Sequence, residues 1–194
     1  MEKLFDPMNF QPEILHFGRR NSILIPIERK AGETVAEFKT NVMRILDKAR
    51  IPYTPHAYSA GDGAIDAVSV AAKLGLPPDR VFKTLVAKGP AGVCVFILPA
   101  AGELDLKKAA RAAGQKSVAL VRVDEINKYT GYVRGGCSPV GMKKAYPTFL
   151  DESAAGHVTI LVSAGRIGSQ VELAPDSLLA ACGGSYAPLA AEFL

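Results

Sequence analysis

The spacing of apolar residues predicts where the first helix of the chain lies. Thr34 and Glu37 have the spacing of a capping box, and Val42 and Ile45 follow at helical intervals. Pro52 then interrupts the pattern, because proline cannot continue a helix. The sequence therefore predicts a helix that begins at Thr34 and ends before Pro52.

The rest of the chain alternates helical and strand-like patterns in a mixed order. We expect four more helices, over 64–74, 105–113, 124–129 and 176–182. We expect six strands, over 81–87, 93–98, 118–121, 146–150, 158–162 and 170–173, with a short extended segment at 53–58. The short turn between the first two strands predicts an antiparallel hairpin. This order favours a mixed α/β fold with a mainly antiparallel sheet.

Length and composition favour a single folded domain with an extension at its amino end. The chain has 194 residues, 48% of them hydrophobic, which is enough for one substantial core. Residues 1–33 contain aromatic and apolar residues without sustained periodicity. We therefore expect 1–33 to be an N-terminal extension and 34–194 to be the domain.

Charge and cysteine usage narrow the class of protein. The formal net charge of +4 weakly favours an anionic partner. Cys94, Cys137 and Cys182 form no CxxC pair, so neither a zinc site nor a disulfide framework is predicted, and a cytoplasmic location is expected. The sequence has neither a run of about 18 apolar residues nor the pattern of a secretory signal. We expect a protein that is neither embedded in a membrane nor exported.

Lys83 is the most informative single residue, because it lies inside a predicted strand where charged side chains are uncommon. One interpretation is a lysine whose ammonium reaches the margin of the sheet and serves no site. The other is an ammonium that binds a phosphate or polarises a carbonyl group. The residues alone leave both open.

Two glycine-rich loops are candidates for the rim of a binding pocket. The segment 131–141 contains four glycines, and 163–168 contains two directly after a predicted strand. Ordinary turns would give the same pattern, and neither loop matches a nucleotide-binding fingerprint. Cys137 could act as a nucleophile, but no partner base or GxSxG motif is recognisable, and the three histidines lack metal-ligand spacing.

Four segments together resemble the YbaK/EbsC family of free-standing Cys-tRNA(Pro) deacylases, which is related to the editing domain of bacterial prolyl-tRNA synthetases. They are VFKTL at 81–85, GELDLKK at 102–108, TGYVRGGCSPVGMKK at 130–144 and VSAGRIGSQVEL at 162–173. The resemblance spans about residues 40–190 and keeps the order of the motifs. It implies a small α/β fold with a mixed, barrel-like β-sheet surrounded by helices.

The resemblance also implies an activity and a site. The substrate would be a misacylated tRNA bound by its acceptor end, and the thiol of a mischarged cysteine would attack its own ester. No metal or cofactor is implied. The sequence leaves open whether prolyl-tRNA synthetase is a further partner and whether the protein is a monomer or a homodimer. The catalytic residues would be Lys83, Gly135 and Gly165. The substrate-binding residues would be Tyr58, Thr84, Gly136, Ser138, Pro139 and Ser163.

Two departures from the family pattern leave the amino-acid preference open. Many relatives have a basic residue where Ile167 stands, and some have aspartate where Gln170 stands. A deacylase for Ala-tRNA or another small misacylated amino acid is one alternative, because a pocket distinguishes one methyl or thiol group by only about 1–3 kcal/mol. A module that binds tRNA ends or a synthetase without turnover is the other.

Overall fold

The computed structural model describes residues 39–191. The helices are α1 (Asn41–Lys48), α2 (Ala67–Leu74), α3 (Leu106–Ala112), α4 (Ile126–Thr130) and α5 (Pro175–Cys182), with 3-10 turns at Pro78–Arg80, Val123–Glu125 and Glu152–Gly156. The strands are β1 (Thr54–Ala57), β2 (Phe82–Gly89), β3 (Gly92–Pro99), β4 (Ala119–Leu120), β5 (Thr148–Asp151), β6 (Ile160–Arg166), β7 (Ser169–Leu173) and β8 (Ser185–Ala187).

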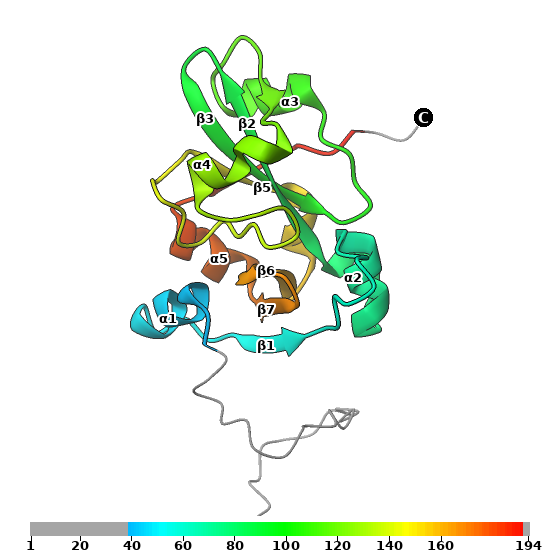
Figure 1. The fold of residues 1–194 in the computed structure, drawn as a ribbon. Coiled ribbons are helices and arrows are strands. Elements are labelled where there is room, and N and C mark those ends of the chain that lie inside the picture. Colours follow the sequence, from blue (N-terminus) through cyan, green and yellow to red (C-terminus); the bar gives the residue numbers. More distant parts are fainter. Residues whose placement is uncertain (1–38, 192–194) are drawn as a thin grey trace, which may run out of the picture. The chain divides into compact units, whose positions relative to one another are not determined.

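The strands form two sheets (Figure 1). The first has the order β1-β7-β6 and is antiparallel; the second has the order β4-β2-β3-β5-β8, in which β5 is parallel to both of its neighbours. A single bridge between Val81 and Leu161 links the two sheets. The predicted α/β fold class and the predicted hairpin of β2 and β3 are confirmed. The strands do not close into a barrel, because within residues 39–191 this bridge is the only backbone pairing between the two sheets.

The main core lies between the sheets and the helices that cover them. Val42 and Leu46 of α1 pack with Ile97 of the larger sheet and Val162 of the smaller one. All residues from Cys94 to Leu98 are buried, because β3 is covered on both faces. A second cluster packs α3 on the opposite face of the larger sheet.

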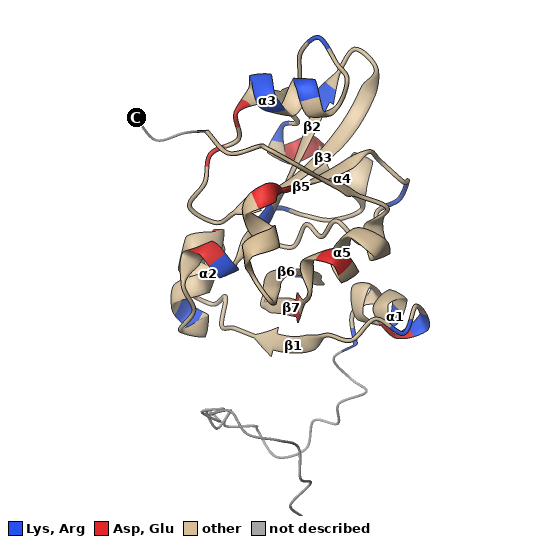
Figure 2. Cartoon of the chain, turned by 180° about the vertical axis from the view of Figure 1, so that it is seen from behind, with Lys and Arg blue, Asp and Glu red and all other residues tan. Residues whose placement is uncertain are grey.

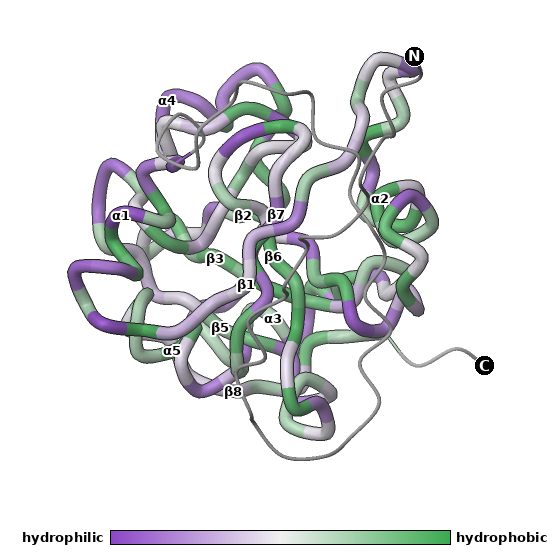
Figure 3. Tube along the Cα trace, turned by 90° about the horizontal axis from the view of Figure 1, so that it is seen from below, coloured by the Kyte–Doolittle hydropathy of each residue, from purple (hydrophilic) through white to green (hydrophobic). Residues whose placement is uncertain are grey.

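Short polar caps fix the helices beside the smaller sheet. Thr40 accepts a hydrogen bond from the Met43 N–H at 3.3 Å, so α1 begins at Asn41 and not at Thr34. Thr34 and Glu37 lie outside the described residues. Asp66 caps α2, which ends at Gly75 in the left-handed conformation. The two helices, α1 and α2, lie on opposite sides of the smaller sheet (Figure 3).

The last strand and the amino-terminal segment differ in how far the sequence described them. The sequence did not predict β8, because its three residues are too few to show an alternation of apolar and polar positions. The proposed extension, residues 1–33, lies outside the described residues. Between residues 39 and 191, no helix has the length and apolar content that crossing a bilayer requires.

Candidate functional site

A cavity of about 410 Å³ opens where the two sheets diverge, and we call it the Lys83 cavity. Residues of β2, of the start of α2, of both strands of the β6–β7 hairpin and of the first glycine-rich loop line this cavity. The lining residues are Ile65, Asp66, Ala67, Val70, Val81, Phe82, Lys83, Thr84, Leu85, Ala100, Arg134, Gly135, Cys137, Ser163 and Gln170. The structure thus brings together segments that are about 100 residues apart in the sequence.

Lys83 lies in β2, and its partly buried side chain lines the cavity. Its Nζ donates a hydrogen bond to the Ala100 carbonyl oxygen at 2.9 Å. Burial lowers the pKa of the Lys83 ammonium, although the negative charges of Glu103 and Asp66 partly offset this effect. An ammonium group has three donors and Ala100 accepts one of them, so Lys83 retains donors for a ligand.

Thr84 lies beside Lys83 at an open stretch of strand. β2 pairs with β4 only at Ala87 and Lys88 and bridges to β6 only at Val81, so no strand within residues 39–191 pairs with Thr84 on this edge. Val86, two residues further on, accepts a hydrogen bond from the Val121 N–H on this same edge. By the alternation of an antiparallel ladder, the N–H and C=O of Thr84 also point to this edge, and the buried Thr84 Oγ1 has no partner.

The first glycine-rich loop is pressed against its neighbours at two positions. Gly135 has a φ of +81°, and a Cβ there would lie 2.7 Å from Cδ1 of Ile65. At Gly136 a Cβ would lie 3.1 Å from the backbone nitrogen of Ile167, which belongs to the second loop. Only glycine allows the two loops to approach this closely. At Gly136 the first loop therefore lies directly against the second.

The remaining candidates of these loops have different surroundings. Ser163 lines the cavity, and its Oγ accepts a hydrogen bond from the Gly165 N–H at 3.2 Å. Gly165 itself lies outside the lining, with its α-carbon against Tyr132 and Val42. Ser138 and Pro139 are buried, and the Ser138 Oγ accepts from the Val140 N–H. These three residues therefore shape the loops and do not face the cavity.

Tyr58 follows β1, and its buried hydroxyl has no hydrogen-bond partner among the described residues. Its N–H donates to the Gly168 carbonyl oxygen at 3.0 Å, which continues the pairing of His56 with Gln170. Tyr58 therefore extends from the same face of the smaller sheet as Gln170. It is not among the residues that line the cavity.

Gln170 is a site residue that sequence reasoning did not select. It is 5% exposed, lines the cavity opposite Ser163, and carries a buried side-chain oxygen without a partner. The sequence marked it only as a departure from the family pattern. Its polar side chain inside a predicted strand was the available signal, of the same kind that identified Lys83.

The cavity carries two cationic groups and one carboxylate. Lys83 and the exposed Arg134 line it, and Asp66 is engaged as the cap of α2 by both the N–H and the hydroxyl of Ser69. Burial raises the pKa of the Cys137 thiol to about 11, so this thiol is protonated at neutral pH. The cavity therefore favours an anionic ligand and lacks an activated cysteine.

A polar network anchors the strand that carries Gln170. Glu172 accepts hydrogen bonds from Arg80 at 2.6 Å and from Thr159 at 2.5 Å, and its second oxygen lies 2.7 Å from Nε2 of His56. Burial would raise the pKa of Glu172, but the hydrogen bonds from Thr159 and His56 and the nearby Arg80 guanidinium lower it overall. β7 is thereby tied to β1 and to the turn before β2.

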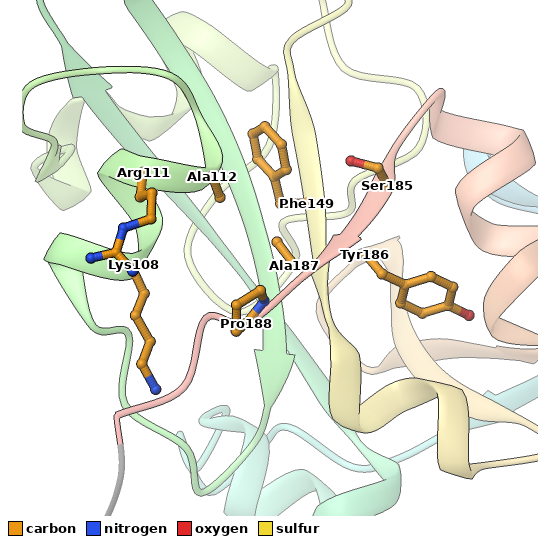
Figure 4. Close-up of a pocket in the computed structure, with 8 residues that line it drawn as sticks. All are labelled: Lys108, Arg111, Ala112, Phe149, Ser185, Tyr186, Ala187 and Pro188. Atoms are coloured by element: carbon orange, nitrogen blue, oxygen red, sulfur yellow. The ribbon is translucent and has the colours of Figure 1, made fainter.

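A second hollow, the α3 hollow, has a volume of about 240 Å³ and lies between α3, β5 and β8 (Figure 4). Its residues are Lys108, Arg111, Ala112, Phe149, Ser185, Tyr186, Ala187 and Pro188. The basic residues of α3 are visible in Figure 2. Lys108 donates a hydrogen bond to the Ala190 carbonyl oxygen, and Tyr186 donates one to Asp176. Of the buried side-chain atoms that have no hydrogen-bond partner within residues 39–191, none belongs to this hollow.

Nowhere in residues 39–191 do three His, Cys, Asp or Glu side chains gather as a metal site would require.

Comparison with known proteins gives consistent matches. Residues 62–181 match the family model of the aminoacyl-tRNA editing domain. EbsC of Enterococcus faecalis, named as a candidate Cys-tRNA(Pro)/Cys-tRNA(Cys) deacylase, is 43% identical over 152 residues, which are 78% of this chain and 93% of that protein. A proline–tRNA ligase of Fervidobacterium nodosum is 34% identical over 91 residues, or 47% of this chain and 15% of the ligase. The crystal structure of a candidate trans-editing enzyme for prolyl-tRNA synthetase superimposes with a TM-score of 0.68 at 25% identity, covering 79% of this chain and 99% of that one.

Proposed function

The chain belongs to the aminoacyl-tRNA editing domain family, and we propose that it hydrolyses misacylated tRNA in trans, with Cys-tRNA(Pro) as its main substrate. The observation that carries this proposal is the Lys83 ammonium in a cavity between two sheets, beside polar atoms that have no partner. Such a cavity suits the terminal adenosine of a tRNA and its esterified amino acid. The name of the Enterococcus faecalis relative supports the substrate.

Binding of the tRNA end would use the cations of the cavity. We assign Lys83 to the terminal phosphate or ribose, with Arg134 at the exposed rim as a second cation. Thr84 and Ser163, which line the cavity, would contact the nucleoside and the amino acid. Tyr58, on the same face of the smaller sheet as Gln170, would contact the part of the substrate that extends beyond this lining. Gly136, Ser138 and Pro139 would hold the first loop in the shape that this contact requires. The single carboxylate of the lining, Asp66, accepts hydrogen bonds from Ser69 at the start of α2, and the positive charges of Lys83 and Arg134 would outweigh its negative charge.

Hydrolysis of the ester would need positioning more than a protein nucleophile, because an aminoacyl ester is already activated. The cysteine thiol of the substrate would attack its own ester carbonyl, forming a carbon–sulfur bond as the carbon–oxygen bond to the ribose breaks. The ribose oxygen would take up the thiol proton, and water would later open the resulting thiolactone. The protonated Cys137 has no part in these steps.

The ester carbonyl oxygen would accept hydrogen bonds from backbone amides. Gly135 lines the cavity, and the N–H of Thr84 points to the open edge of β2, so both suit this role. Gly165 would act indirectly, because its N–H already donates to Ser163. We therefore assign Gly165 to shaping the second loop.

The substrate is tested by release of labelled amino acid from Cys-tRNA(Pro), Ala-tRNA(Pro) and Pro-tRNA(Pro). The proposal expects fast release of cysteine and no release of proline above the spontaneous rate. Alanine should be released slowly, because it lacks the attacking thiol. Faster release of alanine than of cysteine would favour the Ala-tRNA deacylase. Binding of all three without release would favour a non-catalytic module.

We further propose prolyl-tRNA synthetase as the partner that supplies selectivity for the tRNA. The likeness of 91 residues to part of a proline–tRNA ligase supports a shared origin for the two editing sites. Pull-down of the purified synthetase, with and without tRNA(Pro), tests this partner. Absence of a complex under both conditions would contradict it.

The domain itself is proposed to comprise residues 34–194, with residues 1–33 as an extension that deacylation does not need. The residues that match the editing domain begin at 62, well after the extension. A chain lacking 1–33 should melt at the same temperature and deacylate at the same rate as the full chain. Loss of folding and activity together would place the extension within the core.

A further inference from the structure

The side-chain oxygen of Gln170 is a buried acceptor that nothing in the described part of the protein satisfies. Three side-chain oxygens share this property: Tyr58 Oη, Thr84 Oγ1 and Gln170 Oε1. Gln170 is the most enclosed of the three residues, with 5% exposure, and it lines the Lys83 cavity. A buried acceptor without a partner is destabilising, so a polar site that is kept in this state is expected to be filled by a ligand.

The neighbours of Gln170 are already engaged with other groups. Ser163, the residue of β6 that pairs with Gln170, accepts a hydrogen bond from the Gly165 N–H. His56, the residue of β1 that pairs with Gln170, has its Nε2 atom 2.7 Å from a Glu172 oxygen. Glu172 also accepts a hydrogen bond from Arg80. Neither Ser163 nor His56 donates a hydrogen bond to Gln170 Oε1. Its Oε1 remains available to a hydrogen-bond donor that enters the cavity.

The position of Gln170 indicates which part of the substrate supplies this donor. The cations that suit phosphate and ribose are Lys83 on β2 and the exposed Arg134 at the rim, whereas Gln170 lies on the smaller sheet and is nearly fully buried. With the nucleotide held by the cations, the amino acid lies deeper. Its α-amino group is the strongest donor there, because a thiol donates only weakly.

We propose that Gln170 holds the α-amino group of the esterified amino acid, which donates a hydrogen bond to Oε1. This inference rests on the proposed function, since it names a contact inside the same site. It makes Gln170 a substrate-binding residue that fixes the orientation of the amino acid. The ester carbonyl would then face the amides of Gly135 and Thr84, and the amino group would lie on the opposite side.

The test compares substrates with and without the amino group in matched proteins. The wild type, Gln170→Met and Gln170→Glu are assayed on Cys-tRNA(Pro) and on 3-mercaptopropionyl-tRNA(Pro), which has the same thiol and lacks the amine. Gln170→Met keeps the side-chain length and removes the acceptor. It should lower kcat/KM on Cys-tRNA(Pro) about tenfold and leave the amine-free substrate unchanged. The amine also makes the ester more reactive, so the rates of the two substrates are not compared directly. For each substrate, kcat/KM of the variant is compared with kcat/KM of the wild type.

Gln170→Glu serves as the matched control that retains an acceptor oxygen. It should keep or increase the preference for the amine-bearing substrate, because a carboxylate binds an ammonium group more strongly than an amide oxygen does. Thermal melting establishes whether each variant is folded. If Gln170→Met does not fold, the Gln170→Glu variant decides, and a lowered preference for the amine in it would overturn the proposal.

The outcomes separate this inference from the function on which it rests. Equal losses on both substrates in Gln170→Met would overturn the amine contact while leaving deacylation intact. Ala-tRNA(Pro) provides a third arm: a loss in Gln170→Met on Cys-tRNA(Pro) but not on Ala-tRNA(Pro) would assign Gln170 to the thiol instead. If the wild type released no acyl group from any of the three substrates, the proposed function would fail, and the amine contact with it.

Discussion

Two hollows of this protein carry cationic side chains, the Lys83 cavity between the sheets and the α3 hollow beside β8. In the α3 hollow, Lys108 and Tyr186 bind carbonyl and carboxylate oxygens of the protein, and Arg111 is exposed. In the Lys83 cavity, Thr84 and Gln170 each bury a side-chain oxygen for which residues 39–191 supply no hydrogen-bond partner. Positive charge alone therefore does not distinguish a site from a solvated surface, whereas enclosed and unpaired polar groups do.

The largest expected effect is at Lys83, where charge and enclosure coincide. Lys83→Met keeps the length and apolar stem of the side chain and removes the ammonium. We expect kcat/KM for deacylation of Cys-tRNA(Pro) to fall by about 100-fold or more, because a preorganised donor is lost from a partly buried site. Steady-state rates of the folded variant measure this loss. A fall of less than threefold would remove Lys83 from the site.

The second effect concerns the glycine-rich loop that closes the Lys83 cavity. Gly135→Ala puts a Cβ at a φ of +81° and 2.7 Å from Ile65. We expect a loss of about 1–2 kcal/mol in the free energy of unfolding and a displaced loop that deacylates about tenfold more slowly. Denaturant unfolding and deacylation rates measure the two quantities.

The matched control for this loop is Gly183→Ala, at the end of α5. Gly183 has a φ of +66°, and a Cβ there would meet nothing within 4 Å. It should lose a similar free energy of unfolding and keep its activity. Equal activity losses in the two variants would mean that strain, and not the shape of the cavity, limits the rate.

The third effect is a pH dependence that only the Lys83 cavity should produce. Burial lowers the pKa of Lys83 from 10.5, so the ammonium loses its proton at a lower pH than an exposed lysine does. Above this lowered pKa, kcat/KM should fall about tenfold per pH unit, because the neutral amine no longer attracts phosphate. The profile is measured from pH 7 up to pH 10.5, the ordinary pKa of a lysine, after subtraction of spontaneous hydrolysis. A flat profile in wild type, equal to that of Lys83→Met, would contradict the role of the ammonium.

The smallest effect is expected in the α3 hollow. Arg111→Ala removes an exposed cation that binds no described group, so deacylation should stay within about twofold of wild type. The same assay as for Lys83→Met provides the measurement. A loss comparable to that of Lys83→Met would make the α3 hollow part of the substrate site and erase the distinction between the two.

The sequence predicted the parts of the fold that local patterns encode. The β2–β3 hairpin follows from two apolar runs and a short turn, and α2 follows from its cap and Gly75. Lys83 was selected because a charge inside a strand is unusual. The start of α1 was wrong by several residues, because Thr40 caps this helix and Thr34 offers the same chemistry nearby.

The rest of the site depends on contacts between distant segments, which a single sequence does not encode. The contact of Gly136 with Ile167 joins two loops, and the network of Glu172 with Arg80 spans 92 residues. Gln170 becomes informative only when its burial and its missing partner are known. For the same reason, Gly165 was expected at the cavity, although its N–H is used by Ser163.

The central claim is that the Lys83 cavity, and not the α3 hollow, receives the aminoacylated end of the tRNA. The most direct measurement is a titration with 3′-(L-alanylamino)-3′-deoxyadenosine, a non-hydrolysable analogue of that end, followed by the backbone amide chemical shifts of the protein. The account predicts shift changes at Lys83, Thr84, Gly135 and Ser163. Changes confined to Arg111, Phe149 and Ser185 would contradict it.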